Sequence, residues 1–131
     1  MTEVLRRQFL QGATASPLRR EARGILLRWA GDDRDSTWLD DVLIVISELV
    51  HNVVRHTAAG AGELIISVKP GSVLVQVGDC STRAPVLPAV DPARPGGRGL
   101  QLIQSLARQW GVRTCRAGKS VWAVLPSPAP A

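Results

Sequence analysis

The sequence predicts a two-layer α/β sandwich, in which a mixed, mostly antiparallel sheet is covered by helices on one face. Three observations predict this fold class. Two apolar segments alternate like strands around a Pro70-Gly71 turn, three other segments repeat their apolar residues at helical spacing, and strict strand–helix–strand alternation is absent. A doubly wound parallel sheet is therefore not expected.

The length and composition predict one domain with one core. The chain has 131 residues, of which 45% are hydrophobic, and this is enough for a single hydrophobic core. We expect the domain to span residues 1–125. The Pro- and Ala-rich segment 126–131 is expected to be a disordered tail.

Each element has its own local signal. Ser16-Pro17 offers a helix cap followed by Pro at the first helical position, and Gly31 is a typical helix stop. Pro70-Gly71 is typical of a type II turn. The expected elements are a strand at 4–12, helices at 18–31 and 36–57, a hairpin at 63–69 and 72–79, a long loop at 80–97, a helix at 98–111 that stops at Gly111, and a hairpin at 112–125 that turns at Ala117-Gly118.

Charge and apolar runs argue against two classes of protein. The 16 basic and 11 acidic residues give a net charge of +5, but the basic residues are scattered, which favours an acidic partner or a nucleotide over direct nucleic-acid binding. The longest apolar run, 42–46, is far too short to cross a membrane, and no export signal is recognised. A soluble, cytoplasmic protein is expected, with Cys80 and Cys115 as free thiols.

The second helix carries polar residues at the edge of an apolar face. On a helical wheel Glu48 and Asn52 lie one turn apart beside the core arc. A carboxylate and an amide oxygen on a rigid helix suit Mg²⁺, which prefers oxygen ligands and keeps water and phosphate ligands. Taken alone, this pair is more typical of a solvated helix edge.

Two later segments point to the same chemistry. Asp79 ends an apolar strand in "VQVGD", where it could bind the amino group of a base, although such an Asp is also common in turns. The segment "GGRGL", 96–100, opens a helix with glycines whose backbone N–H groups can bind an anion, and Arg98 could add a charged contact. Alone, this segment could equally be a flexible turn.

Together and in this order, the motifs resemble those of the Bergerat-fold (GHKL) ATPases. The closest resemblance is to the small anti-sigma-factor serine kinases. "SELVHNVVRH" is similar to the N box, "VQVGDCSTRAP" to the first glycine box, and "GGRGLQLIQSLARQWG" with "GKSVWAVL" to the second box and closing strands. The resemblance covers residues 4–125.

The resemblance implies a role for each motif residue. Glu48 would assist phosphoryl transfer, Asn52 would bind Mg²⁺, and Asp79 would read the adenine amino group. The phosphates of ATP would meet the segment that contains Gly97, Arg98, Gly99 and Leu100. Residues 80–96 would form a short lid.

The first glycine box departs from the family pattern. It usually continues Asp-x-Gly-x-Gly, whereas here Ser81 and Arg83 occupy the two glycine positions. The resemblance implies a protein kinase that binds Mg-ATP, phosphorylates an anti-anti-sigma (STAS) partner, sequesters a sigma factor and can form a homodimer. The departures keep open an alternative, a partner-sequestering module of the same fold that binds nucleotide weakly or lacks catalysis. The net charge alone motivates a third hypothesis, a nucleic-acid-binding regulator, which is the least favoured.

Overall fold

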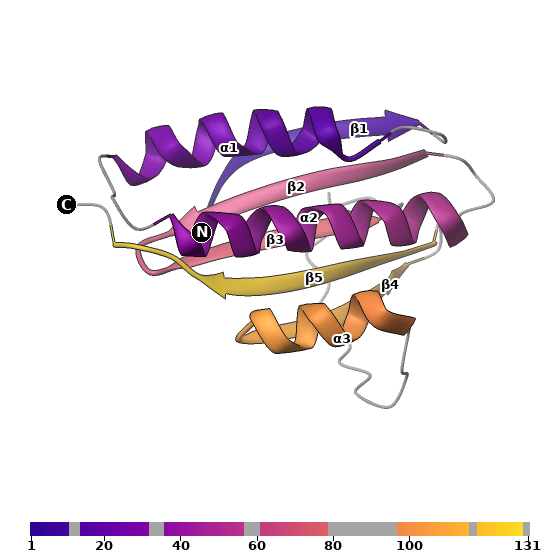
Figure 1. The fold of residues 1–131 in the computed structure, drawn as a ribbon. Coiled ribbons are helices and arrows are strands. Elements are labelled where there is room, and N and C mark those ends of the chain that lie inside the picture. Colours follow the sequence, from indigo (N-terminus) through magenta and orange to yellow (C-terminus); the bar gives the residue numbers. More distant parts are fainter. Residues whose placement is uncertain (11–13, 32–35, 57–60, 79–96, 116–117, 130–131) are drawn as a thin grey trace.

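The computed structural model describes residues 1–10, 14–31, 36–56, 61–78, 97–115 and 118–129, with the backbone alone at 53–56, 97–100 and 115. These residues form eight elements (Figure 1). In chain order they are β1 (Thr2–Leu10), α1 (Ser16–Ala30), α2 (Thr37–His56), β2 (Ala61–Lys69), β3 (Ser72–Gly78), α3 (Gly97–Leu106), β4 (Gln109–Cys115) and β5 (Gly118–Pro126).

Within the described residues, the strands form one five-stranded sheet in the order β1-β2-β3-β5-β4. Each neighbouring pair is antiparallel, so the sheet is wholly antiparallel rather than mixed. The helices cover one face of this sheet (Figure 1). The predicted two-layer α/β sandwich is confirmed. Because β5 lies between β3 and β4, the last strand of the chain joins the two hairpins into one sheet.

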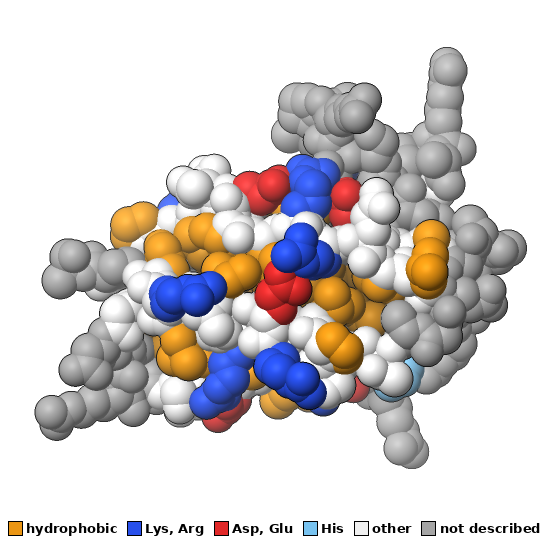
Figure 2. Space-filling view, turned by 90° about the horizontal axis from the view of Figure 1, so that it is seen from above, with side chains coloured by type: hydrophobic (Ala, Val, Ile, Leu, Met, Phe, Trp, Pro, Cys, Tyr) orange, Lys and Arg blue, Asp and Glu red, His pale blue; other side chains and the backbone are white. Residues whose placement is uncertain are grey.

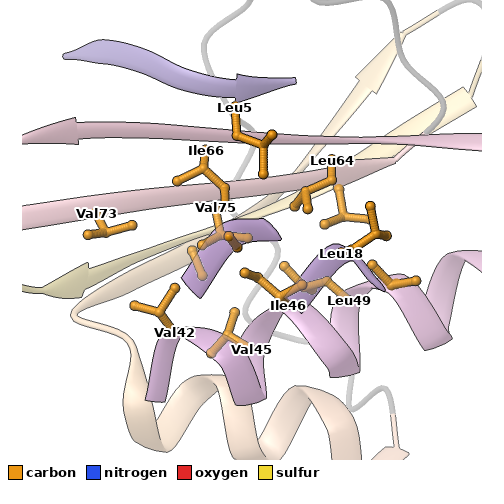
Figure 3. Close-up of a cluster of buried hydrophobic side chains, with 14 of the residues drawn as sticks. Leu5, Leu18, Val42, Val45, Ile46, Leu49, Leu64, Ile66, Val73 and Val75 are labelled. Atoms are coloured by element: carbon orange, nitrogen blue, oxygen red, sulfur yellow. The ribbon is translucent and has the colours of Figure 1, made fainter. Parts of the chain in front are cut away.

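The core lies between α2 and the central strands (Figure 3). Helix α2 contacts β2, β3 and β5 beneath it and α1 and α3 beside it. Its inward side chains are fully buried and repeat at helical spacing, and burying one Leu or Ile in this way stabilises the fold by about 1.5–3 kcal/mol. They are Leu39, Val42, Val45, Ile46 and Leu49, which share one core cluster with Leu64, Ile66, Val73 and Val75 of the sheet.

Helix α1 buries a narrow apolar stripe made of Leu18, Ala22 and Leu26. The helix already includes Ser16, and its N-cap is Ala15 without a side-chain cap hydrogen bond, so the expected Ser16 cap is wrong. At the other end the prediction is confirmed. Gly31 has a φ of 75° and donates its N–H to the Leu27 carbonyl, which ends the helix.

The third helix is shorter than expected. Helix α3 ends at Leu106 and β4 begins at Gln109, so Trp110 and Gly111 lie in a strand. Gly111 is not a helix stop. A Cβ atom at this position would lie 2.7 Å from a ring carbon of Trp122, because the indole of Trp122 crosses the neighbouring strand there.

The β2–β3 turn and the chain's tail are bonded to each other. Gly71 has a φ of 89°, as the second central residue of a type II turn requires. Its carbonyl accepts the N–H of Ser127 at 3.1 Å and a guanidinium N–H of Arg108 at 3.4 Å, and its own N–H donates to the Pro128 carbonyl at 3.3 Å. Part of the segment that was expected to be a disordered tail is therefore held against the turn.

Among the helices of the described residues, none is both long enough and apolar enough to cross a membrane.

Candidate functional site

Helix α2 holds the two polar residues of the candidate site at the edge of its buried face. The side chains of Glu48 and Asn52 are half-buried, while Leu49 between them is fully buried. This is the position that the helical wheel predicts for them. Because the inward face of α2 is packed against the sheet, these two side chains are carried by a rigid element.

The opposite edge of α2 is fixed separately. Ser47 donates its hydroxyl to the Leu43 carbonyl at 3.0 Å and accepts a hydrogen bond from the Arg19 guanidinium of α1 at 2.7 Å. His51 is exposed. The rotation of α2 about its axis is thus set from two sides, by its buried face and by the edge that Ser47 bonds to α1.

Three elements bring the predicted motifs to one end of the molecule. The C-terminal half of α2, the end of β3 at Gly78 and the start of α3 at Gly97 all lie at the right-hand end in Figure 1, and α2 packs against both β3 and α3. Of the predicted residues, Asp79 and the segment 80–96 lie outside the described residues, as does Cys80. At Arg98 and Leu100 the structure describes the backbone alone, as it does at Cys115.

The start of α3 has the electrostatic character of an anion site. Gly97, Arg98, Gly99 and Leu100 make up its first turn, where backbone N–H groups have no partner within the helix and the helix dipole is positive. No acidic residue occupies this turn. The glycines let a phosphate approach the backbone closely, because they have no side chain to exclude it.

The donor set present suits Mg²⁺ bound together with phosphate. The half-buried amide of Asn52 offers one neutral oxygen, and Glu48 lies one turn before it on the same helix. Mg²⁺ in phosphate-transfer sites takes one or two protein ligands and fills its remaining positions with phosphate and water. Among the described residues there is no cluster of three His, Cys, Asp or Glu side chains that would hold a metal by protein ligands alone.

Gly78, the last residue of β3, was not among the predicted site residues. Its signal is a glycine at the end of an otherwise apolar, alternating strand, directly before Asp79. A glycine within a strand often marks a place where another backbone approaches closely.

The described residues form a two-layer α/β domain, in which the glycine-rich start of α3 lies at the same end as Glu48 and Asn52 of α2. The sequence model of the histidine kinase-like ATPase domain matches residues 11–125, which is most of the chain, and the chain belongs to this family. Membership implies that this is an ATP-binding domain of the GHKL type, and such domains usually bind ATP together with Mg²⁺. Among curated proteins, none matches this chain.

Proposed function

We propose that the protein is an ATP-dependent serine/threonine protein kinase that phosphorylates a small anti-anti-sigma (STAS) partner and sequesters a sigma factor. The observation that carries this proposal is the pairing of Glu48 and Asn52, half-buried one turn apart on α2, in a domain of the histidine kinase-like ATPase family. A general base next to an oxygen ligand for Mg²⁺ is what transfer to a hydroxyl group requires.

In the proposed reaction, a hydroxyl oxygen of the partner forms a bond to the γ-phosphorus of ATP. The bond between that phosphorus and the bridging oxygen breaks, and ADP leaves with the electron pair. The carboxylate of Glu48 accepts the proton of the attacking hydroxyl group. The remaining work is positioning and charge stabilisation, which dominate catalysis of phosphoryl transfer.

Each remaining motif residue has a binding role. Asn52 would hold Mg²⁺, which supplies neutralisation of phosphate charge. The backbone N–H groups of Gly97, Gly99 and Leu100 would hold the phosphates, and Arg98 would contact the γ-phosphate. Asp79 would accept a hydrogen bond from the adenine amino group. These assignments rest on the positions of the elements and on the family.

The surface charge supports an acidic protein partner. Basic side chains gather over α1, with acidic side chains among them (Figure 2). Arg20, Arg23 and Arg28 are exposed on this helix, whereas Arg7 is already paired with Glu21 of the same helix. Such a surface attracts an acidic partner and speeds its encounter with the kinase.

The test is the isosteric variant Glu48→Gln, assayed for transfer of labelled γ-phosphate to a Ser-bearing STAS partner. General-base catalysis contributes about 10²–10⁴-fold to a rate, so we expect transfer to fall by at least about a hundredfold. The Kd for Mg-ATP, measured by calorimetry, should stay within about twofold, because Gln preserves the shape of the side chain.

The matched control is Asp40→Asn, which removes an exposed acid from the first turn of the same helix. This variant should transfer phosphate at the wild-type rate. Equal transfer rates in Glu48→Gln and wild type would remove Glu48 from the mechanism.

The second candidate is a module that binds its partner without phosphorylating it. It is favoured by Ser81 and Arg83, which occupy glycine positions of the first glycine box. It predicts that the wild-type protein retains the partner on a column but transfers no label in the presence of Mg-ATP. The kinase proposal predicts label on the partner within the same experiment.

A further inference from the structure

The outward face of helices α1 and α2 carries two large apolar side chains that the core does not use. Among the described residues, four large hydrophobic side chains are exposed, and two of them, Met1 and Leu10, lie at either end of β1. The other two, Leu27 of α1 and Ile44 of α2, lie within helices and are 37% and 40% exposed. Polar residues usually occupy exposed helix positions, so this pair needs a further reason.

Two contacts fix how α1 and α2 lie against each other. The Arg19 guanidinium donates to Ser47 Oγ at 2.7 Å, and the rings of Trp29 and Trp38 meet edge to face with 6.4 Å between their centroids. Moving forward along α1 from the first contact to the second means moving backward along α2, so the two helices run antiparallel (Figure 1).

This arrangement places basic side chains beside the apolar pair. Arg23 lies one turn beyond Arg19 along α1, at about the same level as Ile44 of α2, and Leu27 follows one turn later. Arg20 and Arg23 are both exposed. The exposed cationic and apolar side chains of the two helices form one α1–α2 surface, which consists of Arg20, Arg23, Leu27 and Ile44.

Gly24 lies within the part of α1 that carries this surface, and nothing inside the chain requires a glycine there. It has no positive φ, and a Cβ atom at this position would meet no atom within 4 Å beyond its own stretch of helix. A glycine in the middle of a helix costs about 1 kcal/mol relative to alanine. Between Arg20 and Leu27, each about one turn away, Gly24 leaves a flat spot where the backbone of another chain can approach closely.

We infer that the α1–α2 surface is the docking site for an acidic amphipathic helix of a protein partner. Leu27 and Ile44 would pack against the apolar face of that helix, and the guanidinium groups would pair with its carboxylates. The charge of α1 favours an acidic occupant, because its one acid, Glu21, is already paired with Arg7 of β1. The inference rests on the proposed function for the need of a protein partner, but it does not depend on phosphoryl transfer.

Charge and shape favour this occupant over two others. A second copy of the chain that docked through the same surface would bring two basic helices together, which repel each other. A membrane surface binds a helix whose apolar stripe inserts as a unit. The apolar stripe of α1, made of Leu18, Ala22 and Leu26, is instead buried in the core, and only Leu27 of its large apolar side chains is exposed.

Fluorescence polarisation with a labelled model peptide tests the inference on the full chain. The probe is a helical peptide of about 20 residues, with Leu at helical spacing on one face and Glu on the other. One reference peptide has the same composition in scrambled order, and a second has Lys in place of Glu. We expect the probe to bind at least about tenfold more tightly than either reference peptide.

Variants of the surface should weaken this binding without loss of stability. Leu27→Asp and Ile44→Asp should each lower the affinity for the probe at least about tenfold, because each replaces an apolar anchor with a charge that repels the probe. Gly24→Leu should also lower the affinity but raise the melting temperature, since leucine favours a helix and has free space there. The matched control is Leu10→Asp, at an exposed apolar position on β1, which should bind the probe as wild type does.

Three outcomes overturn the inference. One is a probe that binds no more tightly than the scrambled peptide, and another is wild-type affinity in Leu27→Asp, Ile44→Asp and Gly24→Leu. The third is a different occupant. Vesicles of anionic phosphatidylglycerol that bind the chain through Leu27, or a homodimer that Ile44→Asp dissociates in analytical ultracentrifugation, would assign the surface to a membrane or to a second copy.

Failure of this inference can be told apart from failure of the proposed function. The probe needs no ATP, so Glu48→Gln should bind it as tightly as wild type does. Label transfer to the Ser-bearing STAS partner by a chain that does not bind the probe overturns the docking surface alone. Probe binding that depends on Leu27 and Ile44, in a chain that transfers no label, supports the docking surface and overturns the kinase.

Discussion

The two sides of α2 perform different tasks with the same helical geometry. The inward side is fully buried against the sheet through residues such as Ile46 and Leu49, and it fixes where the helix lies. The edge that carries Glu48 and Asn52 is only half-buried and contributes little to the core. This difference between the two sides shows that the core sets the position of the candidate site, whereas the polar groups at the edge supply its chemistry. Mutations on the two sides should therefore separate stability from binding.

The largest effect on stability is expected from the inward side. Ile46→Ala removes a fully buried side chain and leaves a cavity, which should lower the free energy of unfolding by about 2–5 kcal/mol. The matched control is Ile44→Ala on the outward side of the same helix, where the side chain is 40% exposed, and it should change stability by less than about 0.5 kcal/mol. Urea denaturation followed by circular dichroism measures both. Equal losses would contradict the assignment of the two sides.

Mutations at the half-buried edge of α2 should weaken nucleotide binding and leave stability unchanged. Asn52→Ala removes the proposed Mg²⁺ ligand and should weaken Mg-ATP binding at least tenfold, which is about 1.4 kcal/mol, with stability unchanged within about 0.5 kcal/mol. In the presence of a chelator, Asn52→Ala and wild type should bind ATP with the same affinity, because no Mg²⁺ is then bound in either protein. His51→Ala, on the exposed neighbour, serves as the control. A similar affinity loss with and without Mg²⁺ would assign Asn52 to the nucleotide rather than to the metal.

The smallest effect is expected far from α2, at an exposed ion pair on β1. The Arg6 guanidinium donates to the Glu3 carboxylate and holds the pKa of Glu3 below its ordinary value of 4.5. The pair therefore stabilises the fold above that pH, and its contribution is lost as the pH falls through the lowered pKa. Because both side chains are about two-fifths exposed, Glu3→Gln should cost only a few tenths of a kcal/mol at neutral pH.

Urea denaturation of wild type and Glu3→Gln across pH provides the measurement. The difference between them should shrink as the pH falls through the lowered pKa of Glu3, and disappear where the carboxyl is protonated in the folded and the unfolded protein. A gap that persists there would mean that Glu3 acts through packing, and the contrast between a buried face and a surface pair would then be smaller than proposed.

Much of this fold could be predicted from local patterns. The buried face of α2, the β2–β3 hairpin and its Pro70-Gly71 turn were all predicted, because apolar spacing and turn chemistry act over a few residues. The half-buried position of Glu48 and Asn52 also follows from spacing alone. Their roles stay predictions, as do those of Asp79 and the first turn of α3.

The errors occurred where a distant residue decides the local structure. The helical spacing of α3 continues through Leu106, Ala107 and Trp110, yet the chain enters β4 at Gln109. Just before this strand, Arg108 donates its N–H to the Val124 carbonyl of β5. Pairing with another strand outweighs local periodicity there. Gly111 was predicted as a helix stop, but its lack of a side chain makes room for the indole of Trp122. Neither contact can be predicted from a short window of sequence.

The bonds between Ser127, Pro128 and the Gly71 turn have a practical consequence. They hold the start of the tail at the end of the molecule opposite the candidate site, where Figure 1 draws the C-terminus. A fluorescent label or an affinity handle attached after residue 129 would thus be anchored away from the candidate site. Immobilising the protein through that end leaves the end that carries the candidate site open to the solution.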